Sequence, residues 1–355
     1  MNALELSSQE VALQVMQRMG EAADDAARAG VFTRYAEKRR PNTLTAQRGD
    51  LAMFAKYLAT VAPAGVTMPT GAALQTTGAA WHGVTWGIVA GFVEWLKRDG
   101  YAVGTINRAL ATVKTYTKLA ALAGVVSAAD LALVRAVEGY KPGDGETMDA
   151  QRTAAGVATR RGYKKASHVR LTLAQCRALK TQPNTPQGRR DALLIALMLD
   201  HGLRESEAAG LEAAGVNMAA KTITFWRQKV RNTDTQHMTP ATLRAMQAWI
   251  DAGECPALGP VLRSSRKGGE LQPRPMTLSA IRQRVRTLGE AAGVEGLSPH
   301  DLRHAWAESM GRMVAAGTLT LFQFQEMGGW ASLEMPRRYV ARAAISNEGV
   351  QYADD

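Results

Sequence analysis

A segment rich in helix breakers near the middle of the chain most strongly limits the folds open to this sequence. It begins with Lys141-Pro-Gly-Asp-Gly-Glu and stays polar and basic as far as residue 168. Proline and closely spaced glycines interrupt both helices and strands, so residues 141–168 are predicted to be a basic linker. The length of 355 residues is the size expected of two ordinary domains. We therefore expect one folded part on each side of this linker.

The residues before the linker show helical periodicity and no alternation typical of strands. In the first helix, Val11, Val15 and Met19 recur every four residues, and a glycine follows its end. Residues 63–80 are rich in Gly, Thr, Ala and Pro, which predicts a long loop. Helices are expected at residues 8–29, 43–61, 86–98, 105–123 and 128–138. This part is predicted to be all-α, with a helical extension over residues 1–40 and a helical domain over 41–140.

The residues after the linker predict a mixed α+β domain over 169–355. Its first helix carries a capping box, Thr172-Leu-Ala-Gln175, and a long apolar helix follows at residues 189–200. Short β-compatible stretches at residues 215–218, 221–226 and 236–239 predict a small antiparallel sheet. Residues 255–276 are irregular and basic, and the remainder is helical. The fold class is therefore mainly α, an all-α N-terminal domain followed by an α+β domain.

The charge of the chain favours nucleic acid as a partner. Lysine and arginine number 43 against 32 acidic residues, a formal net charge of +11, although solubility alone can also explain a basic protein. The first 30 residues do not have the pattern of a secretory signal, and the longest apolar runs are far shorter than the roughly 20 residues that span a membrane. The only cysteines, Cys176 and Cys255, have no neighbours at ligand spacing. This usage fits a cytoplasmic protein without a disulfide scaffold.

Several kinds of chemistry have no matching motif in the sequence. There is no glycine-rich nucleotide loop, no His-Glu-x-x-His element and no cluster of acids suited to a two-metal nuclease. We therefore expect neither a cofactor nor a metal.

Three short elements of the second half carry side chains suited to an anion. Arg204 follows a predicted helix end at Gly202-Leu203, with Glu207 three residues later; His300-Asp-Leu-Arg303 stands at a predicted helix start; and Gly329-Trp330 precedes Tyr339 by nine residues. Side-chain and backbone donors at a helix start converge where an anion binds. Each element alone is more often structural: an arginine at a helix start is usually on the surface, and a tyrosine late in a helix is usually core.

Taken in this order and spacing, the elements resemble the tyrosine recombinases, also called phage-type integrases. Trp330 makes the sequence similar to Cre within that family. Thr43–Leu58 and the Thr-Ile-Asn-Arg108 helix resemble the family's core-binding (SAM-like) domain, and Leu171–Gln175 resembles the opening of its catalytic domain. The family also places a lysine in a β-hairpin turn. Lys229 is the best match for it, with Arg231 as the alternative.

The resemblance implies a role for each of these side chains. Arg204 and Arg303 stabilise the charge that develops on a phosphodiester, with His300 and the Trp330 indole N–H as further donors. Tyr339 attacks phosphorus and forms a 3′-phosphotyrosyl link, Lys229 protonates the departing 5′-oxygen, and Glu207 orients Arg204 or His300. The covalent link preserves the bond energy, so the resemblance implies no ATP, metal or cofactor.

The resemblance also implies a partner, double-stranded DNA with an inverted-repeat target site. The protein would be a monomer in solution and a homotetramer on two sites, exchanging strands through a Holliday junction. Basic side chains are expected on the DNA phosphates. They are Arg39, Arg40, Arg108, Lys114, Lys118, Arg160, Arg161, Lys164, Lys165, Arg266, Lys267, Arg282 and Arg286.

Two other functions are compatible with parts of this pattern. A type IB topoisomerase uses a similar set of side chains to relax DNA, and a DNA-binding regulator could retain the fold without catalysis. The compact helical N-terminal half favours a recombinase over the topoisomerase, and the intact set of Arg204, His300, Arg303 and Tyr339 disfavours the regulator. The sequence leaves open the target site and its spacer, and whether the enzyme is an integrase, a resolvase or part of a mobile element.

Overall fold

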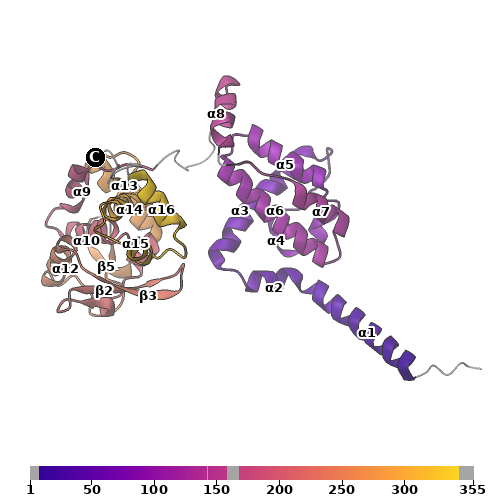
Figure 1. Cartoon of the computed structure of the whole chain (residues 1–355), viewed down its shortest axis with the longest axis horizontal. Coiled ribbons are helices and arrows are strands. Elements are labelled where there is room, and N and C mark those ends of the chain that lie inside the picture. Colours follow the sequence, from indigo (N-terminus) through magenta and orange to yellow (C-terminus); the bar gives the residue numbers. More distant parts are fainter. Residues whose placement is uncertain (1–7, 142, 158–167, 267, 344–355) are drawn as a thin grey trace, which may run out of the picture. The chain divides into compact units, whose positions relative to one another are not determined.

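The computed structural model describes residues 8–141, 143–157, 168–266 and 268–343, which form two compact units, Met1–Lys164 and Lys165–Asp355 (Figure 1). Each unit has its own hydrophobic core. Among the described residues, no helix is long and apolar enough to cross a membrane. The division of the sequence into four parts stays a prediction.

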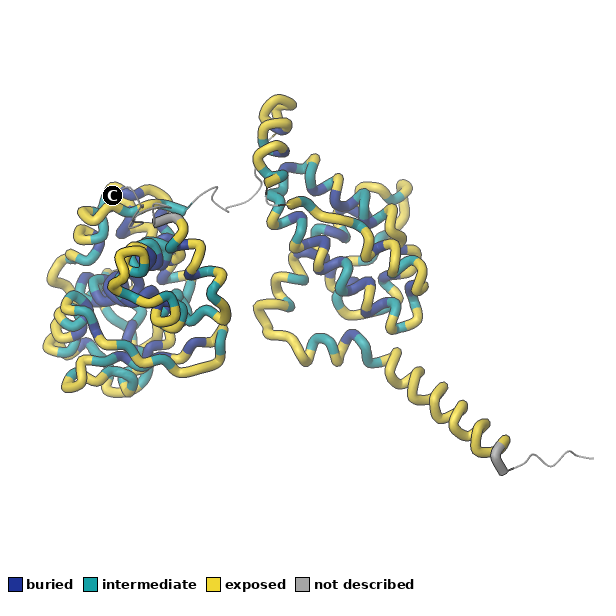
Figure 2. The backbone as a smooth tube through the Cα atoms, viewed as in Figure 1, coloured by how far each residue is buried: buried dark blue, intermediate teal, exposed yellow. Residues whose placement is uncertain are grey.

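The first unit is all-α, as predicted. Its helices are α1 (Ser8–Ala29), α2 (Val31–Glu37), α3 (Pro41–Val61), α4 (Gly71–Thr76), the 3-10 turn η1 (Ala79–Trp81), α5 (Trp86–Arg98), α6 (Val103–Leu122), α7 (Ala128–Ala136) and α8 (Asp144–Ala154). The apolar face of α6 lies in the core, where Ile106 and Val113 are fully buried. By contrast, α1 is exposed from Glu10 to Ala29 (Figure 2).

The loop expected at residues 63–80 contains helix α4 and runs into η1. The hydroxyl of Thr70 accepts a hydrogen bond from the backbone N–H of Ala73, which caps α4. Trp81 is fully buried and donates its indole N–H to the carbonyl of Leu74 at 2.8 Å. The Gly- and Thr-rich composition therefore did not predict helix α4, which is stabilised by the Thr70 cap and by the buried Trp81.

A buried carboxylate joins α3 to α6. Asp50 is fully buried and accepts hydrogen bonds from Arg108 and from the Thr112 hydroxyl, both at 2.8 Å. Lys114 donates to the backbone carbonyl of Arg135 at 2.9 Å. Arg108 and Lys114 thus have bonds within the unit, while Arg108 keeps 56% of its side chain exposed. Their expected DNA contacts stay predictions.

The expected linker is partly helical. Helix α8 lies inside residues 141–168, and its Arg152 is buried. The guanidinium of Arg152 donates to the backbone carbonyls of Lys97 at 2.7 Å and Tyr101 at 2.9 Å. These bonds attach α8 to the end of α5, so this stretch of the expected linker is helical and packs on the first unit. Composition alone suggests that the basic Arg152 is solvated. Instead its guanidinium donates to backbone carbonyls in and just after the last turn of α5.

The second unit is mainly helical with two small antiparallel sheets. Its helices are α9 (Leu173–Lys180), α10 (Pro186–Asp200), α11 (Glu205–Ala209), the 3-10 turn η2 (Ala213–Gly215), α12 (Pro240–Asp251), α13 (Leu278–Ala291), α14 (Pro299–Ala315), α15 (Leu321–Gly328) and α16 (Glu334–Ala343). The residues from Leu193 to Leu199 are all buried, which places α10 at the centre of the core.

The sheets differ from the expectation in two places. Strands β1 (Val216–Asn217), β2 (Thr222–Arg227) and β3 (Asn232–His237) form one sheet in that order, so the third strand begins earlier than residue 236. The segment expected to be irregular contains the hairpin of β4 (Arg263–Ser265) and β5 (Leu271–Pro275). Both differences arise because Asn-Thr-Asp-Thr-Gln-His and Leu-Gln-Pro-Arg-Pro lack apolar alternation. Their pairing comes from neighbouring strands, not from their own composition.

Helices α14, α15 and α16 share a smaller cluster of Trp306, Phe324 and Tyr339. Gly311 lies in the middle of α14, where a Cβ atom would stand 3.0 Å from the backbone carbon and oxygen of Tyr339. The absence of a side chain at Gly311 therefore lets α16 approach α14 closely at the position of Tyr339.

We predict opposite stability effects for two Gly→Ala substitutions inside helices. Gly49 in α3 has open space around it, so Gly49→Ala should stabilise the first unit by about 0.5–1 kcal/mol. Gly311→Ala should destabilise the second unit by about 1 kcal/mol or more, because α16 must move. Urea unfolding of each variant measures both effects. A stabilising Gly311→Ala would contradict the close packing of α14 and α16.

Candidate active site

The turn between α10 and α11 presents Arg204. Helix α10 ends at Asp200, as predicted, Gly202 follows with φ +61°, and α11 begins directly after Arg204. Glu207 is buried, and its carboxylate accepts from the Arg204 backbone N–H at 2.9 Å and from the Arg204 guanidinium at 2.6 Å. Glu207 therefore fixes both the helix start and the direction of Arg204.

The start of α14 presents His300 and Arg303. Ser298 and Asp301 form a capping box, in which the Ser298 backbone N–H donates to the Asp301 carboxylate at 2.8 Å. Arg303 is buried on the same helix and donates to the carbonyls of Gly202 and Gly328, the latter at 2.5 Å. One bond of Arg303 thus returns to the turn that carries Arg204.

The C-terminal end of α15 accepts hydrogen bonds from three arginines. Arg303 and Arg204 donate to the carbonyls of Gly328 and Gly329, with Arg204 at 3.3 Å from the Gly329 oxygen. The third, Arg227 of β2, donates to the carbonyl of Met327 at 2.6 Å. The carbonyls that end a helix lack partners within it and carry partial negative charge. Gly329 ends the helix with φ +56°, and a Cβ there would stand 2.7 Å from the Arg227 side chain.

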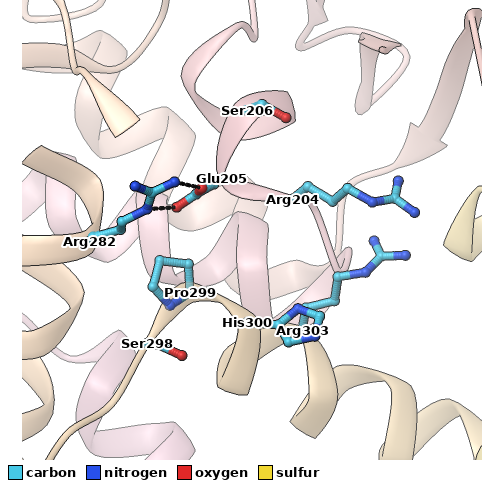
Figure 3. A pocket seen from close by; sticks show the side chains of 8 residues that line it. All are labelled: Arg204, Glu205, Ser206, Arg282, Ser298, Pro299, His300 and Arg303. Atoms are coloured by element: carbon cyan, nitrogen blue, oxygen red, sulfur yellow. Dashed lines mark hydrogen bonds and ion pairs between the residues drawn. The ribbon is translucent and has the colours of Figure 1, made fainter. Parts of the chain in front are cut away.

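Arg204, His300 and Arg303 line one cavity of about 440 Å³. Figure 3 shows the two guanidiniums extending side by side in the same direction. Burial, followed by the charge of Arg204, lowers the pKa of Arg303 to about 9, so this guanidinium keeps its proton at neutral pH. Burial and the Arg303 charge also lower the pKa of His300, which favours its neutral form. The cavity therefore presents two fixed cations and an imidazole to an anion.

Tyr339 of α16 is buried, with 5% of its surface exposed. Its hydroxyl lies 2.6 Å from Nδ1 of His304, and the His304 ring is 4.3 Å from the ring of His300. His304, which follows Arg303 directly, received no role in the sequence analysis. The structure therefore connects the predicted nucleophile to the cavity through a histidine.

Trp330 packs between the arginine and the tyrosine. Its ring centroid is 5.2 Å from the Arg303 guanidinium and 6.0 Å from the Tyr339 ring. Trp330 thus lies close to two other predicted site residues, Arg303 and Tyr339. A hydrogen bond from its indole N–H to a phosphate stays a prediction.

Lys229 lies in the β2–β3 turn, as the sequence predicted. The turn covers residues 228–231, and both Lys229 and Arg231 are exposed in it. Arg231 has φ +56°, an uncommon backbone conformation for a residue other than glycine. An exposed hairpin tip can reach a bound polymer, but the geometry leaves the choice between the two side chains open.

Arg227 is a second residue that sequence reasoning missed. Only 1% of its side chain is exposed, and its guanidinium bonds the carboxylates of Glu207, at 3.4 Å, and Asp234, at 2.5 Å. The sequence did contain a signal for it. Ile223 and Phe225 are the buried positions of β2, and the alternation of a strand puts Arg227 on the same face.

The basic residues expected on DNA differ in their surroundings. Arg39, Arg40, Lys118 and Arg286 are exposed, while Arg282 makes two hydrogen bonds to Glu205 at the rim of the cavity (Figure 3). Arg266 pairs with Glu270 at 3.4 Å. Outside the described residues lie Arg160, Arg161, Lys164, Lys165 and Lys267. The DNA contacts of all these side chains stay predictions.

Comparison with known proteins places the second unit in a family. The model of the phage integrase family matches residues 169–344. Through these residues, the second unit belongs to the phage integrase family. Tyrosine recombinase XerD of Neisseria meningitidis serogroup B is 32% identical over 186 residues, which are 51% of this chain and 60% of XerD. The chain thus spans less than two thirds of that relative.

Solved structures of this family share the fold. A lambda integrase dimer bound to a COC' core site matches with a TM-score of 0.56 and 13% identity, over 96% of this chain and 82% of that one. The Tn1549 transposon integrase in complex with transposon right end DNA matches with a TM-score of 0.55 and 13% identity, over 88% of this chain and 94% of that one. These likenesses confirm the predicted fold class, a helical N-terminal domain followed by an α+β domain.

We predict that Arg227 is required for the stability of the second unit. Arg227→Met keeps a long side chain but leaves Glu207 and the Met327 carbonyl without its hydrogen bonds. Breaking a buried ion pair in this way costs about 3–5 kcal/mol. Arg286→Met, on the exposed surface of α13, is the matched control and should change the free energy of unfolding by no more than about 0.5 kcal/mol. Equal effects of the two substitutions in urea unfolding would contradict this role.

Proposed function

We propose that this chain is a tyrosine site-specific recombinase, which cleaves and rejoins double-stranded DNA through a 3′-phosphotyrosyl intermediate. One observation carries the proposal. The guanidiniums of Arg204 and Arg303 share a cavity with His300, and the Tyr339 hydroxyl is connected to His300 through His304. Two fixed cations beside a tyrosine suit an attack on a phosphodiester, because the transition state gains charge on its nonbridging oxygens.

In this proposal each side chain acts at a defined atom. Arg204 and Arg303 donate to the nonbridging oxygens of the scissile phosphate, with His300 and Trp330 as further donors. The Tyr339 oxygen attacks phosphorus while the bond to the 5′-oxygen breaks, and Lys229 gives that oxygen its proton. Glu207 holds Arg204 in place. Reversal of these steps with another 5′-hydroxyl joins a new pair of strands, and the energy of the bond is conserved.

The partners follow from the same proposal. The substrate is DNA that carries an inverted-repeat site, bound by a homotetramer across two sites with a Holliday junction as intermediate, and the free protein is a monomer of the cytoplasm. Several basic side chains predicted on phosphates are exposed, namely Arg39, Arg40, Lys118 and Arg286. Arg282, by contrast, is bonded to Glu205. Trp330, nine residues before the nucleophile, supports a Cre-like variant of the site.

We predict that Tyr339 alone forms the covalent link. DNA flanking the gene, chosen for an inverted repeat with a short spacer and nicked to trap cleavage, should give an adduct with the wild-type protein on a denaturing gel. Tyr339→Phe should give none, because it lacks the attacking oxygen. Tyr352→Phe, which changes the other tyrosine near the end of the chain, is the control and should give the wild-type amount. An adduct with Tyr339→Phe would contradict the assignment.

The same proteins separate the rival functions. A type IB topoisomerase would relax supercoiled plasmids that lack the repeat, whereas a recombinase should act only on plasmids that carry it. A DNA-binding regulator would bind the repeat without forming an adduct.

We predict that Lys229, and not Arg231, protonates the leaving 5′-oxygen. Lys229→Ala should slow cleavage of ordinary DNA by about 10²- to 10⁴-fold, the usual contribution of a general acid. A substrate with sulfur in place of the bridging 5′-oxygen needs no such proton, because a thiol is far more acidic than an alcohol, and Lys229→Ala should cleave it at close to the wild-type rate. Arg231→Ala should slow both substrates equally or neither. Selective recovery with Arg231→Ala would reverse the assignment.

A further inference from the structure

A group of three histidines and a glutamate lies next to the Tyr339 hydroxyl. The His304 ring stacks on the His168 ring at 4.8 Å and meets the edge of the His300 ring at 4.3 Å. His168 in turn lies 2.9 Å from the carboxylate of Glu308, measured from its Nε2. The Tyr339 hydroxyl lies 2.6 Å from Nδ1 of His304, and the centroids of the two rings are 5.8 Å apart.

We propose that His304 is the base that removes the proton of Tyr339, and that His168, held by Glu308, positions the His304 ring for this task. The inference rests on the proposed function, because it assigns the step that makes Tyr339 a nucleophile. A phenol with an ordinary pKa near 10 is almost entirely protonated at neutral pH and attacks phosphorus poorly in that form. His304 contacts the reacting oxygen itself, and none of the side chains assigned so far accepts its proton.

The surroundings of His304 keep its ring neutral before DNA binds. Burial, and next the neighbouring imidazoles of His300 and His168, lower the pKa of His304 to about 4. Asp301 and Glu308 act in the opposite direction. A neutral ring has a free lone pair on one nitrogen, and the hydroxyl of Tyr339 points at Nδ1. A bound phosphodiester adds negative charge beside this group, which raises the pKa of His304 and favours uptake of the proton.

The step balances within these groups. As the bond from the Tyr339 oxygen to phosphorus forms, the phenolic proton passes to Nδ1 of His304. The bond from phosphorus to the 5′-oxygen breaks, and that oxygen receives a proton from Lys229. During rejoining, the 5′-hydroxyl loses its proton to Lys229, and His304 returns its proton to the departing Tyr339 oxygen. No oxidant, metal or further reactant is required.

His168 and Glu308 act on this step through the His304 ring. His168 stands at the beginning of the described part of the second unit, 136 positions before His304 in the chain, and Glu308 lies one turn beyond His304 on α14. The contact of His168 Nε2 with the Glu308 carboxylate holds the His168 ring, which stacks on one face of His304. His168 is therefore a positioning residue, since it does not touch the reacting oxygen.

A measurement on the free protein tests the proton assignment without DNA. Nitrogen-15 NMR of the histidine rings at pH 7 should show His304 neutral, with its proton on Nε2 and an unprotonated Nδ1 that accepts from Tyr339. Tyr339→Phe should shift the His304 Nδ1 signal. A charged His304, or a proton on Nδ1, would overturn the inference while leaving the proposed function intact.

Cleavage kinetics test the role in the reaction. His304→Gln keeps a polar side chain but removes the base, so cleavage at pH 7 should slow by at least 10²-fold, and the rate should rise about tenfold per pH unit up to pH 8.5 as the phenol ionises. The wild-type rate should be nearly constant over that range. His304→Ala should recover activity when imidazole is added. His168→Ala should slow cleavage about tenfold and keep the flat pH profile, because the base remains.

His237→Gln, an exposed histidine of β3, is the matched control and should leave both rate and profile unchanged. A flat pH profile for His304→Gln, or no recovery of His304→Ala with imidazole, would overturn the inference. Wild-type protein that forms no adduct would instead overturn the proposed function on which the inference rests.

Discussion

The carbonyl oxygens at the end of α15 hold the site together. Three guanidiniums reach them from separate parts of the second unit: Arg204 from the α10–α11 turn, Arg227 from β2 and Arg303 from α14. Like charges so close together repel, and they are stable here because a helix end supplies partial negative charge while Glu207 and Asp234 supply two carboxylates. In the proposed function, a phosphate meets donors that are already oriented, which is the condition for strong electrostatic stabilisation of a transition state.

The three arginines have different tasks. Arg227 is buried and fully engaged with carboxylates and a carbonyl, so it supports the site without facing the cavity. Arg204 and Arg303 line the cavity and bond only part of their donors to the protein. This division explains how a cluster of cations can be both stable and available. The same logic extends to Tyr339, whose hydroxyl is buried yet paired with His304, a group that can take its proton.

The sequence predicted those residues of the candidate site that belong to short motifs. Arg204 after a helix end, His300 and Arg303 one turn apart, and Tyr339 at its distance from Trp330 could all be read from short motifs. Arg227 and His304 could not, because their roles depend on which strand face is buried and on which helix packs against α16. The same limit applies to the fold. Amphipathic helices were predicted. By contrast, α8 is held by the end of α5, and β3 and the β4–β5 hairpin are held by pairing with neighbouring strands, which their own composition does not reveal.

A crystal structure of Tyr339→Phe bound to uncleaved DNA that carries the target site tests the central claim most directly. The account predicts that nonbridging oxygens of one phosphate accept hydrogen bonds from Arg204 and Arg303, with phosphorus facing the ring of residue 339. Arg227 should remain bonded to Asp234 and to the carbonyl of Met327. A phosphate bound elsewhere, or one that draws Arg227 away from the end of α15, would contradict the account.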